Sequence, residues 1–292
     1  MADSTKHIYT LEADIQDLLK TKGWFNKDDA NAFTEEITRR LASQYQSPTQ
    51  GAKLRLSQMG PQCPKALWHS IHTPTEAEPF PPWTELKFSF GHITEGLAIA
   101  LAKSAGHEVV GEQDELILDG IRGHRDCVVD GYTVDVKSCS SRQYQKIKAG
   151  GLAQDDLFGY LDQLDGYMLA SLNDPLVRIK DRSFIFAIDK QLGHMALYEH
   201  KLTEARTHAL KARVARYKEI VQRATPPSCE CDVKRDGSNT KLGVKASYSP
   251  WKWHCFPKLR CFLYSGGPVY LTDVKYEPNV TEVDKFGKEI RR

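Results

Sequence analysis

The segment that most constrains the fold is GHRDCVVDGYTVDVKS, residues 123–138, in which charged side chains interrupt two apolar runs. An Asp-Gly pair between such runs, here at 130–131, predicts a β-hairpin. Residues two apart on a strand point to the same face, so Asp135 and Lys137 share one face of the second strand. Asp126 is expected nearly opposite Asp135 on the first strand. The sequence therefore predicts a sheet that presents two carboxylates and an ammonium group together.

Two carboxylates held a few ångströms apart repel each other unless a cation lies between them. Oxygen ligands of this kind suit Mg²⁺ or Mn²⁺. A lysine beside such an ion can stabilise charge that develops on a phosphate, or orient an attacking water. A solvent-exposed strand face with a cross-strand salt bridge would carry the same residues. The hairpin alone leaves both interpretations open.

The segments around the hairpin predict a sheet covered by helices. Apolar positions recur with helical or strand periods along most of the chain. In chain order we expect a helix at 30–45, a short helix that ends before residue 74, a buried helix at 90–107, three antiparallel strands within 108–141, a helix at about 159–172, strands at 183–190 and 194–202, and a helix at 203–223. This order predicts an α/β (α+β) fold with a central mixed sheet flanked by helices.

Composition excludes some classes of protein. The chain has 292 residues and a formal net charge of +2, which is too small to indicate a charged partner. No apolar run approaches the roughly 18 residues of a membrane helix, and the N-terminus lacks the basic-then-apolar order of a signal peptide. Seven cysteines, an odd number, fit a reducing compartment better than a disulfide framework. We therefore expect a cytoplasmic protein that does not enter membranes.

Two helical segments carry polar pairs at helical spacing. His92 and Glu95 are three residues apart beside an apolar run, and Gln163 and Tyr167 are four residues apart. A single histidine at such a position is usually a core residue, and amphipathic helices contain the second spacing by chance. Neither pair indicates a function when it is taken alone.

Together and in this order, these residues resemble the PD-(D/E)XK nuclease superfamily, in its RecB-like branch. The superfamily pattern is a helix with His and Glu, a strand that ends in Asp, an Asp/Glu-x-Lys strand, and a Gln-x-x-x-Tyr helix. Further segments look similar to those of small exonucleases of tailed bacteriophages: LRLSQMGPQCPKALWHSIHTP, LAKSAGHEV, DLFGYLDQLDGY and CFLYSGGPVYLTDV. The resemblance implies a restriction-endonuclease-like core. It runs from about residue 54 to 274, so we expect a nuclease domain at 51–292 after a helical extension at 1–50.

The resemblance implies a metal-dependent DNA exonuclease that hydrolyses phosphodiester bonds from DNA ends. Such an enzyme would use Mg²⁺ or Mn²⁺ in phage DNA replication, recombination or degradation of host DNA, in the host cytoplasm. Its partner would be DNA ends, single- or double-stranded. Whether it also binds a single-strand annealing or replication protein, and whether it forms an oligomer, is left open. The metal ligands implied are His92, Asp126, Asp135 and the backbone carbonyl of Val136, with Glu95 joining through water.

The remaining catalytic roles also come from the resemblance. Lys137 would position or activate the attacking water, and Gln163 and Tyr167 would orient Lys137 and the DNA end. Basic residues interleaved with an aromatic one follow the Asp-x-Lys strand and suit a groove that tracks a DNA backbone: Arg142, Tyr144, Lys146 and Lys148. Arg55 and Ser57 are expected to cup a phosphate. The basic helix at 203–223 fits a DNA groove and a solvated helix face equally well.

Two other functions fit part of the pattern. A structure- or end-specific endonuclease would use the same metal site, but the chain offers no evident element for reading base edges, which favours an exonuclease. A DNA-end-binding recombination module would need no chemistry. The complete set of residues from His92 to Lys137 argues against that module.

The cysteines fit the superfamily only in part. Several RecB-like nucleases bind an iron–sulfur cluster with one Cys before the core and a Cys-x₂-Cys-x₅-Cys run after it, which holds the C-terminal segment near the first Cys. Cys63 and Cys255 match the first and last positions, but the two middle positions are Ala246 and Ser249. The remaining candidates outside the core strands are Cys229, Cys231 and Cys261, and a one-residue gap is a poor chelating spacing. We therefore expect buried, unligated cysteines, and both a bound iron–sulfur cluster and a bound zinc ion are disfavoured.

Overall fold

The computed structural model describes residues 6–21, 27–44 and 52–291. The chain forms two compact units. The first comprises Met1–Ser47, Leu54–Gly60 and Pro81–Lys211, and the second comprises Pro48–Lys53, Pro61–Phe80 and Ala212–Arg292.

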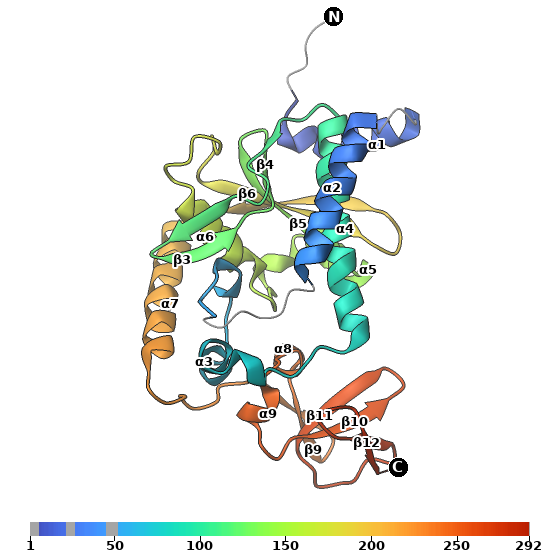
Figure 1. Ribbon diagram of the computed structural model, residues 1–292, viewed down its shortest axis with the longest axis vertical. Coiled ribbons are helices and arrows are strands. Elements are labelled where there is room, and N and C mark those ends of the chain that lie inside the picture. Colours follow the sequence, from blue (N-terminus) through green and yellow to red (C-terminus); the bar gives the residue numbers. More distant parts are fainter. Residues whose placement is uncertain (1–5, 22–26, 45–51, 292) are drawn as a thin grey trace, which may run out of the picture. The chain divides into compact units, whose positions relative to one another are not determined.

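A five-stranded mixed sheet forms the centre of the first unit (Figure 1). Its strand order is β1-β4-β5-β6-β7, and β5 and β6 are parallel whereas the other neighbours are antiparallel. The strands are β1 (Val109–Val110), β4 (Cys127–Val129), β5 (Tyr132–Cys139), β6 (Arg182–Asp189) and β7 (Met195–Lys201). The predicted fold class, with a central mixed sheet flanked by helices, is confirmed.

The predicted hairpin is formed by β4 and β5, with Cys127 opposite Val134. Asp130 and Gly131 at its turn both have positive φ, 51° and 85°. Two successive residues in this region suit the tight two-residue turns of β-hairpins, which explains the Asp-Gly pair.

The expectation of three antiparallel strands within 108–141 was wrong, because this segment forms five strands in two sheets. The additional hairpin pairs β2 (Glu115–Leu118) with β3 (Ile121–His124). A second Asp-Gly turn with positive φ, at Asp119 and Gly120, closes it.

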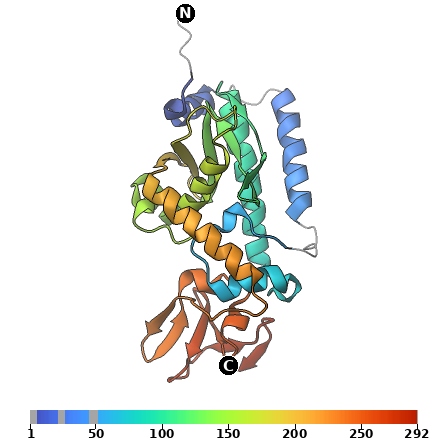
Figure 2. The same cartoon turned by 90° about the vertical axis from the view of Figure 1, so that its left-hand side faces the viewer.

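Helices cover both faces of the five-stranded sheet, as two views of the molecule show (Figures 1 and 2). On one face, η1 (Ile8–Thr10), α1 (Leu11–Thr21) and α4 (Pro82–Ser104) pack on Val134 and Val136. On the other face, α5 (Ser141–Lys148) and α6 (Tyr160–Ala170) pack on Cys139 and on residues of β6. Odd-numbered residues of β5 thus face α5 and α6, and even-numbered ones face α4. Two short 3₁₀ helices, η2 (Leu56–Gln58) and η4 (Gly151–Ala153), complete the unit.

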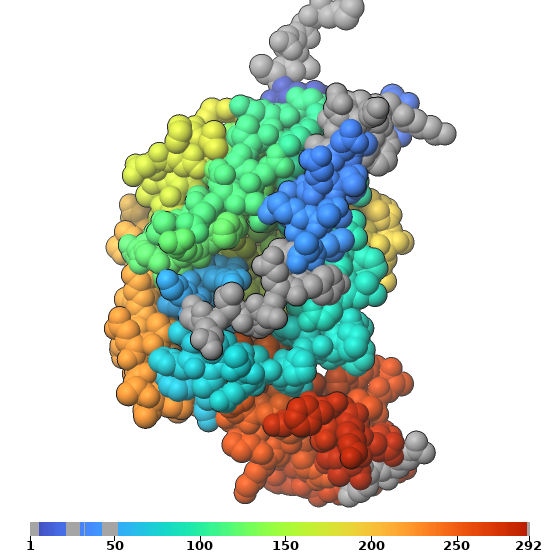
Figure 3. All heavy atoms as spheres, in the orientation of Figure 1, coloured from blue at the N-terminus to red at the C-terminus, as the bar shows by residue number. Residues whose placement is uncertain are grey.

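Helix α2 (Lys27–Gln44) packs beside α4 and forms much of one surface of the first unit (Figure 3). Gly96 allows the close approach, because a Cβ atom there would lie 2.7 Å from Cδ1 of Ile37. The helix predicted at 30–45 is thereby confirmed, except that residue 45 lies outside the described residues, as do parts of the expected extension at 1–50.

A six-stranded antiparallel sheet dominates the second unit, in the order β13-β12-β10-β11-β9-β8. Its strands are β8 (Val233–Asp236), β9 (Asn239–Leu242), β10 (Arg260–Tyr264), β11 (Gly267–Asp273), β12 (Thr281–Val283) and β13 (Glu289–Arg291). Its helices are α3 (Pro64–His72), η3 (Pro74–Glu76), α8 (Val244–Ser247) and α9 (Lys252–Cys255), and α7 (Glu204–Gln222) contains the boundary between the units. None of the helices in the described part of the chain combines the length and the apolar character that crossing a membrane requires.

Candidate active site

The β4–β5 hairpin brings the two predicted carboxylates together. Asp126 directly precedes β4, and its Oδ2 accepts a hydrogen bond of 2.7 Å from the backbone N–H of Val136. Asp135 lies on β5, is 1% exposed, and has its Oδ2 2.6 Å from Nζ of Lys137. The shared face predicted for Asp135 and Lys137 is therefore present, and it is the face that packs against α5 and α6.

Burial and mutual repulsion govern the charges of this group. Burial raises the pKa of Asp126 to about 7, and the charge of Glu95 adds to the effect. Burial also raises the pKa of Asp135 to about 6, although the nearby Lys137 opposes the shift. Burial alone would lower the pKa of Lys137, but the charges of Asp135 and Asp126 outweigh burial and raise it. The site thus holds a permanent cation and two carboxylates whose ionisation is costly without more positive charge.

The hairpin and α4 enclose a cleft of about 380 Å³. It is lined by Lys87, Phe88, Gly91, His92, Glu95, Asp126, Val136, Lys137 and Ser138. Burial, followed by the charge of Arg40, lowers the pKa of His92. Its imidazole is consequently neutral near pH 7 and can offer a ring nitrogen as a ligand. Asp135 is not part of the lining and is linked to the cleft through its ion pair with Lys137.

Glu95 is held by a residue that the sequence analysis missed. Arg40 of α2 is 4% exposed and forms an ion pair with Glu95, and Nε2 of Gln113 donates a 2.8 Å hydrogen bond to the same carboxylate. The neighbouring Arg39 is exposed and pairs only within its own helix, with Glu36. Helical periodicity could have separated the two arginines, because Arg40 follows Phe33 and Ile37 on the side of α2 that packs on α4.

Gln163 and Tyr167 lie beside Asp135. Nε2 of Gln163 donates to the Tyr167 hydroxyl at 2.7 Å and lies 3.4 Å from Oδ1 of Asp135. Tyr167 is 2% exposed, so it orients Gln163 and presents no surface to a DNA end. The aromatic contact of Lys137 is instead Tyr160, whose ring centroid lies 5.1 Å from Nζ and which was not among the predicted residues.

The donor set fits a hard divalent cation in its chemistry. Two carboxylates and a neutral imidazole are available, and the buried Oδ2 of Asp135 has the ammonium group of Lys137 as its ion-pair partner. The carboxylate and imidazole atoms do not converge on one point, however. Among the described residues, the ligand atoms that gather in a group of three or more within 4.8 Å of one another all belong to cysteines. Metal binding would therefore require rotation of side chains, and Lys137 would have to release Asp135.

The residues predicted to hold DNA are spread over two other segments. Arg142 and Lys148 are exposed on α5, but Lys146 forms an ion pair with Asp155. Tyr144 is 1% exposed and its hydroxyl donates to the carbonyl of Met195, so its ring is not available to stack on a base. Arg55 and Ser57 are exposed at η2. None of these six residues lines the cleft.

Several cations of the basic helix α7 are engaged in ion pairs. Arg206 bonds Asp165 and Asp162, whereas Arg216 and Arg223 pair with Glu230 and Glu219. Asp165 is fully buried and also bonds His200 at 2.6 Å, so Arg206 belongs to an internal network. This part of the helix has a structural role.

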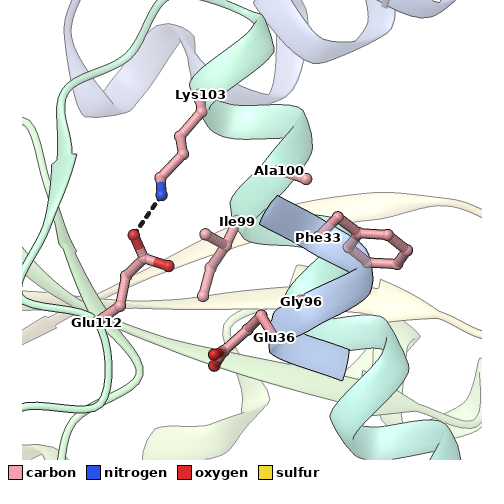
Figure 4. Close-up of a pocket in the computed structure, with 7 residues that line it drawn as sticks. All are labelled: Phe33, Glu36, Gly96, Ile99, Ala100, Lys103 and Glu112. Carbon is pink, nitrogen blue, oxygen red and sulfur yellow. Dashed lines mark hydrogen bonds and ion pairs between the residues drawn. The ribbon is translucent and has the colours of Figure 1, made fainter. Parts of the chain in front are cut away.

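A second, smaller hollow of about 190 Å³ lies between α2 and α4 (Figure 4). Phe33, Gly96, Ile99 and Ala100 give it mainly apolar walls, Glu36 lies at its edge, and an ion pair between Lys103 and Glu112 borders it. Its lining contains none of the charged residues of the hairpin. Its mainly apolar lining distinguishes the hollow from the charged cleft beside the hairpin.

The cysteines are arranged differently from the expectation. Cys63 and Cys255 lie together, but Cys229 and Cys231, which were set aside because of their spacing, lie with them. All four Sγ atoms are within 4.8 Å of one another. The one-residue spacing of Cys229 and Cys231 did not predict this group, because their partners Cys63 and Cys255 come from segments that are distant in sequence. The expectation of buried cysteines that stand apart from one another applies only to Cys127, Cys139 and Cys261.

Comparisons with known proteins give fold-level likenesses alone. No family model matches the chain, and no curated protein matches it. Nine solved chains match. A crystal structure of SSO0001 is 14% identical, with a TM-score of 0.43, over 76% of this chain and 95% of that one. The alkaline exonuclease LHK-Exo from Laribacter hongkongensis is 14% identical with a TM-score of 0.38, and its complex with dAMP is 13% identical with a TM-score of 0.40, each over 65% of this chain and 92% of that one.

Proposed function

We propose that this chain is a Mg²⁺- or Mn²⁺-dependent deoxyribonuclease of the PD-(D/E)XK superfamily that hydrolyses DNA from its ends. The observation that carries the proposal is the pairing of Asp126 with Asp135-Val136-Lys137 across a tight hairpin, beside a cleft that His92 also lines. A solvated strand face does not account for this arrangement, because Asp135 is buried and Asp126 is only partly exposed. Burial of ionised carboxylates costs free energy unless enough positive charge lies nearby. The burial of these two carboxylates therefore supports a bound cation as their ligand.

The metal would be held by His92, Asp126, Asp135 and the backbone carbonyl of Val136, with Glu95 joining through water. A divalent ion there supplies Lewis-acid stabilisation of phosphate oxygens and a more acidic bound water. Arg40 and Gln113 fix the carboxylate of Glu95, so α2 is a positioning element for the site. Gln163, held by Tyr167, limits the orientations open to Asp135.

Lys137 acts as a fixed positive charge. The charges of Asp135 and Asp126 raise its pKa, so the ammonium group is protonated beside these carboxylates. Its role is to orient the attacking water and to stabilise negative charge that develops on the phosphate. The resting ion pair with Asp135 holds the ammonium close to this position.

DNA would approach along α4. Lys87 and Phe88 are exposed in the cleft lining, and they offer a cation for a phosphate and an apolar surface for a base or sugar. Arg142 and Lys148 extend the basic surface on α5. Contacts of this kind follow a backbone without reading base edges, which supports exonucleolytic action. The resemblance of the flanking segments to those of phage exonucleases supports a role in phage DNA metabolism.

Digestion of matched linear and closed-circular DNA tests the proposal. With Mg²⁺ or Mn²⁺ the protein should degrade the linear form and leave the circle intact, and in EDTA both forms should stay intact. Opening of the circle would make the protein an endonuclease. Binding of linear DNA without degradation in either metal would make it an end-binding module.

A further inference from the structure

Four cysteine side chains meet in the second unit. Cys63 precedes α3, Cys229 and Cys231 lie between α7 and β8, and Cys255 ends α9. α3 and α9 lie side by side (Figure 1). Cys63 is separated in sequence from Cys229 by 166 residues and from Cys255 by 192 residues. The group therefore joins segments that sequence proximity does not bring together.

The spacing of the sulfurs matches a single four-coordinate ion. Zinc binds thiolates at about 2.3 Å, and a tetrahedron of that size has sulfurs about 3.8 Å apart. Sγ of Cys63 lies 3.8 Å from Sγ of Cys229 and 3.8 Å from Sγ of Cys255, and no pair among the four exceeds 4.8 Å. A cluster of several irons separates its thiolates further, because they bind different metal atoms. The four sulfurs are also too far apart to be disulfide-bonded.

Backbone donors point at two of the sulfurs. The N–H of Glu230 donates to Sγ of Cys63, and the N–H of Cys231 donates to Sγ of Cys229, both at 3.4 Å. Such hydrogen bonds favour the thiolate form that a metal requires. The segment Cys229-Glu230-Cys231 thus supplies two ligands and two N–H donors. Cys63, Cys229 and Cys231 are partly exposed, unlike ordinary core cysteines.

We propose that Cys63, Cys229, Cys231 and Cys255 bind one Zn²⁺ ion in a structural tetrathiolate site. Soft thiolate ligands in tetrahedral arrangement select zinc over Mg²⁺ or Mn²⁺, and four protein ligands leave no open position for catalysis. The group adjoins an apolar cluster that contains Leu242, Ala246 and Leu259, with Cys231 packed against it. The ion would tie α3 and α9 to the segment that precedes the strand pair β8–β9.

Metal content of the full-length protein tests the site without reference to DNA cleavage, so its outcome is independent of the nuclease proposal. Elemental analysis should find about one zinc per chain that persists after mild EDTA treatment. Apo protein reloaded with Co²⁺ should show the visible absorption of a tetrahedral cobalt thiolate. Cys231→Ser and Cys255→Ser should lose the zinc, whereas Cys261→Ser, at a buried cysteine outside the group, should keep it.

A ligand-preserving variant separates loss of metal from failure to fold. Cys231→His keeps four donors and should retain zinc, and removal of zinc from the wild type by a strong chelator should lower its melting temperature until Zn²⁺ is restored. The proposal is overturned if the purified protein holds no metal, if it holds iron with inorganic sulfide, or if thiol titration finds disulfides among the four. Zinc retained in both serine variants would equally contradict it.

Discussion

At the scale of single residues, the candidate site combines two carboxylates that repel each other with one ammonium group that attracts both. Asp126, Asp135 and Lys137 lie within a single hairpin and its flank, so any change to one alters the ionisation of the others. The folded-state pKa of Asp126, about 7, lies above its ordinary value of 3.8. The folded state therefore binds more protons than the unfolded state between these values, and stability without metal declines as pH rises through this range.

Replacement of Asp126 should stabilise the metal-free protein. Asp126→Asn can still accept the N–H of Val136 but carries no charge, so its melting temperature in EDTA should exceed that of the wild type by a few degrees at about pH 8, with a smaller difference at about pH 5. Thermal melts at the two pH values provide the measurement. Asp17→Asn, at an exposed position on α1, serves as the control and should show no such pH-dependent gain. A variant that melts below the wild type at the higher pH would count against the assigned charges.

Lys137 should contribute to the chemical step and not to metal affinity. Lys137→Met retains much of the side-chain volume, and its kcat should fall by about 10²- to 10³-fold. Its Kd for Mn²⁺ should stay unchanged or decrease, because the ammonium group no longer competes for Asp135. Single-turnover cleavage and titration calorimetry measure the two quantities, with Lys103→Met, which breaks a distant ion pair, as the control. Recovery of the full rate at high Mg²⁺ would show that the lysine acts through metal binding instead.

At the scale of secondary-structure elements, local sequence signals were reliable. The Asp-Gly turn, the alternation along β5 and the periodicity of α4, α6 and α7 depend on neighbouring residues, and these elements are present. Contacts between elements that are far apart in the sequence could not be predicted from these local signals. Arg40 and Glu95 are joined only because Gly96 lets α2 approach α4. Tyr144 was assigned to a DNA surface, although it belongs with Ile147 on the buried side of α5.

The attachment of α2 can be tested at one arginine. Arg40→Met removes the ion pairs of Arg40 with Glu95 and with Glu36 and should lower the free energy of unfolding by about 1–3 kcal/mol. Arg39→Met removes an exposed pair from the same helix and should cost less than about 0.5 kcal/mol. Urea unfolding of the two variants gives the comparison. Equal effects would indicate that Arg40 does not anchor α2 to α4.

At the scale of the whole molecule, the two units offer different candidate metal ligands. The first presents carboxylates and an imidazole beside a cleft, whereas the second gathers four thiols. The carboxylate hairpin was predictable because its residues are close in sequence. The thiol group was not, since its members come from three segments and Cys229-Glu230-Cys231 has an unfavourable spacing for a linear motif. Hard and soft ligands in separate units allow the two sites to be assayed independently.

The most direct test of the central claim is cleavage of an end-labelled linear duplex by the wild type and by Asp126→Asn, once melting curves show that both are folded. The wild type should release labelled nucleotides in Mg²⁺ or Mn²⁺ and none in EDTA, and the variant should be slower by at least about 10²-fold under single-turnover conditions. Asp17→Asn should cleave at the wild-type rate. Cleavage by Asp126→Asn at the wild-type rate, or cleavage by the wild type in EDTA, would contradict the assignment of the hairpin as a metal-dependent nuclease site.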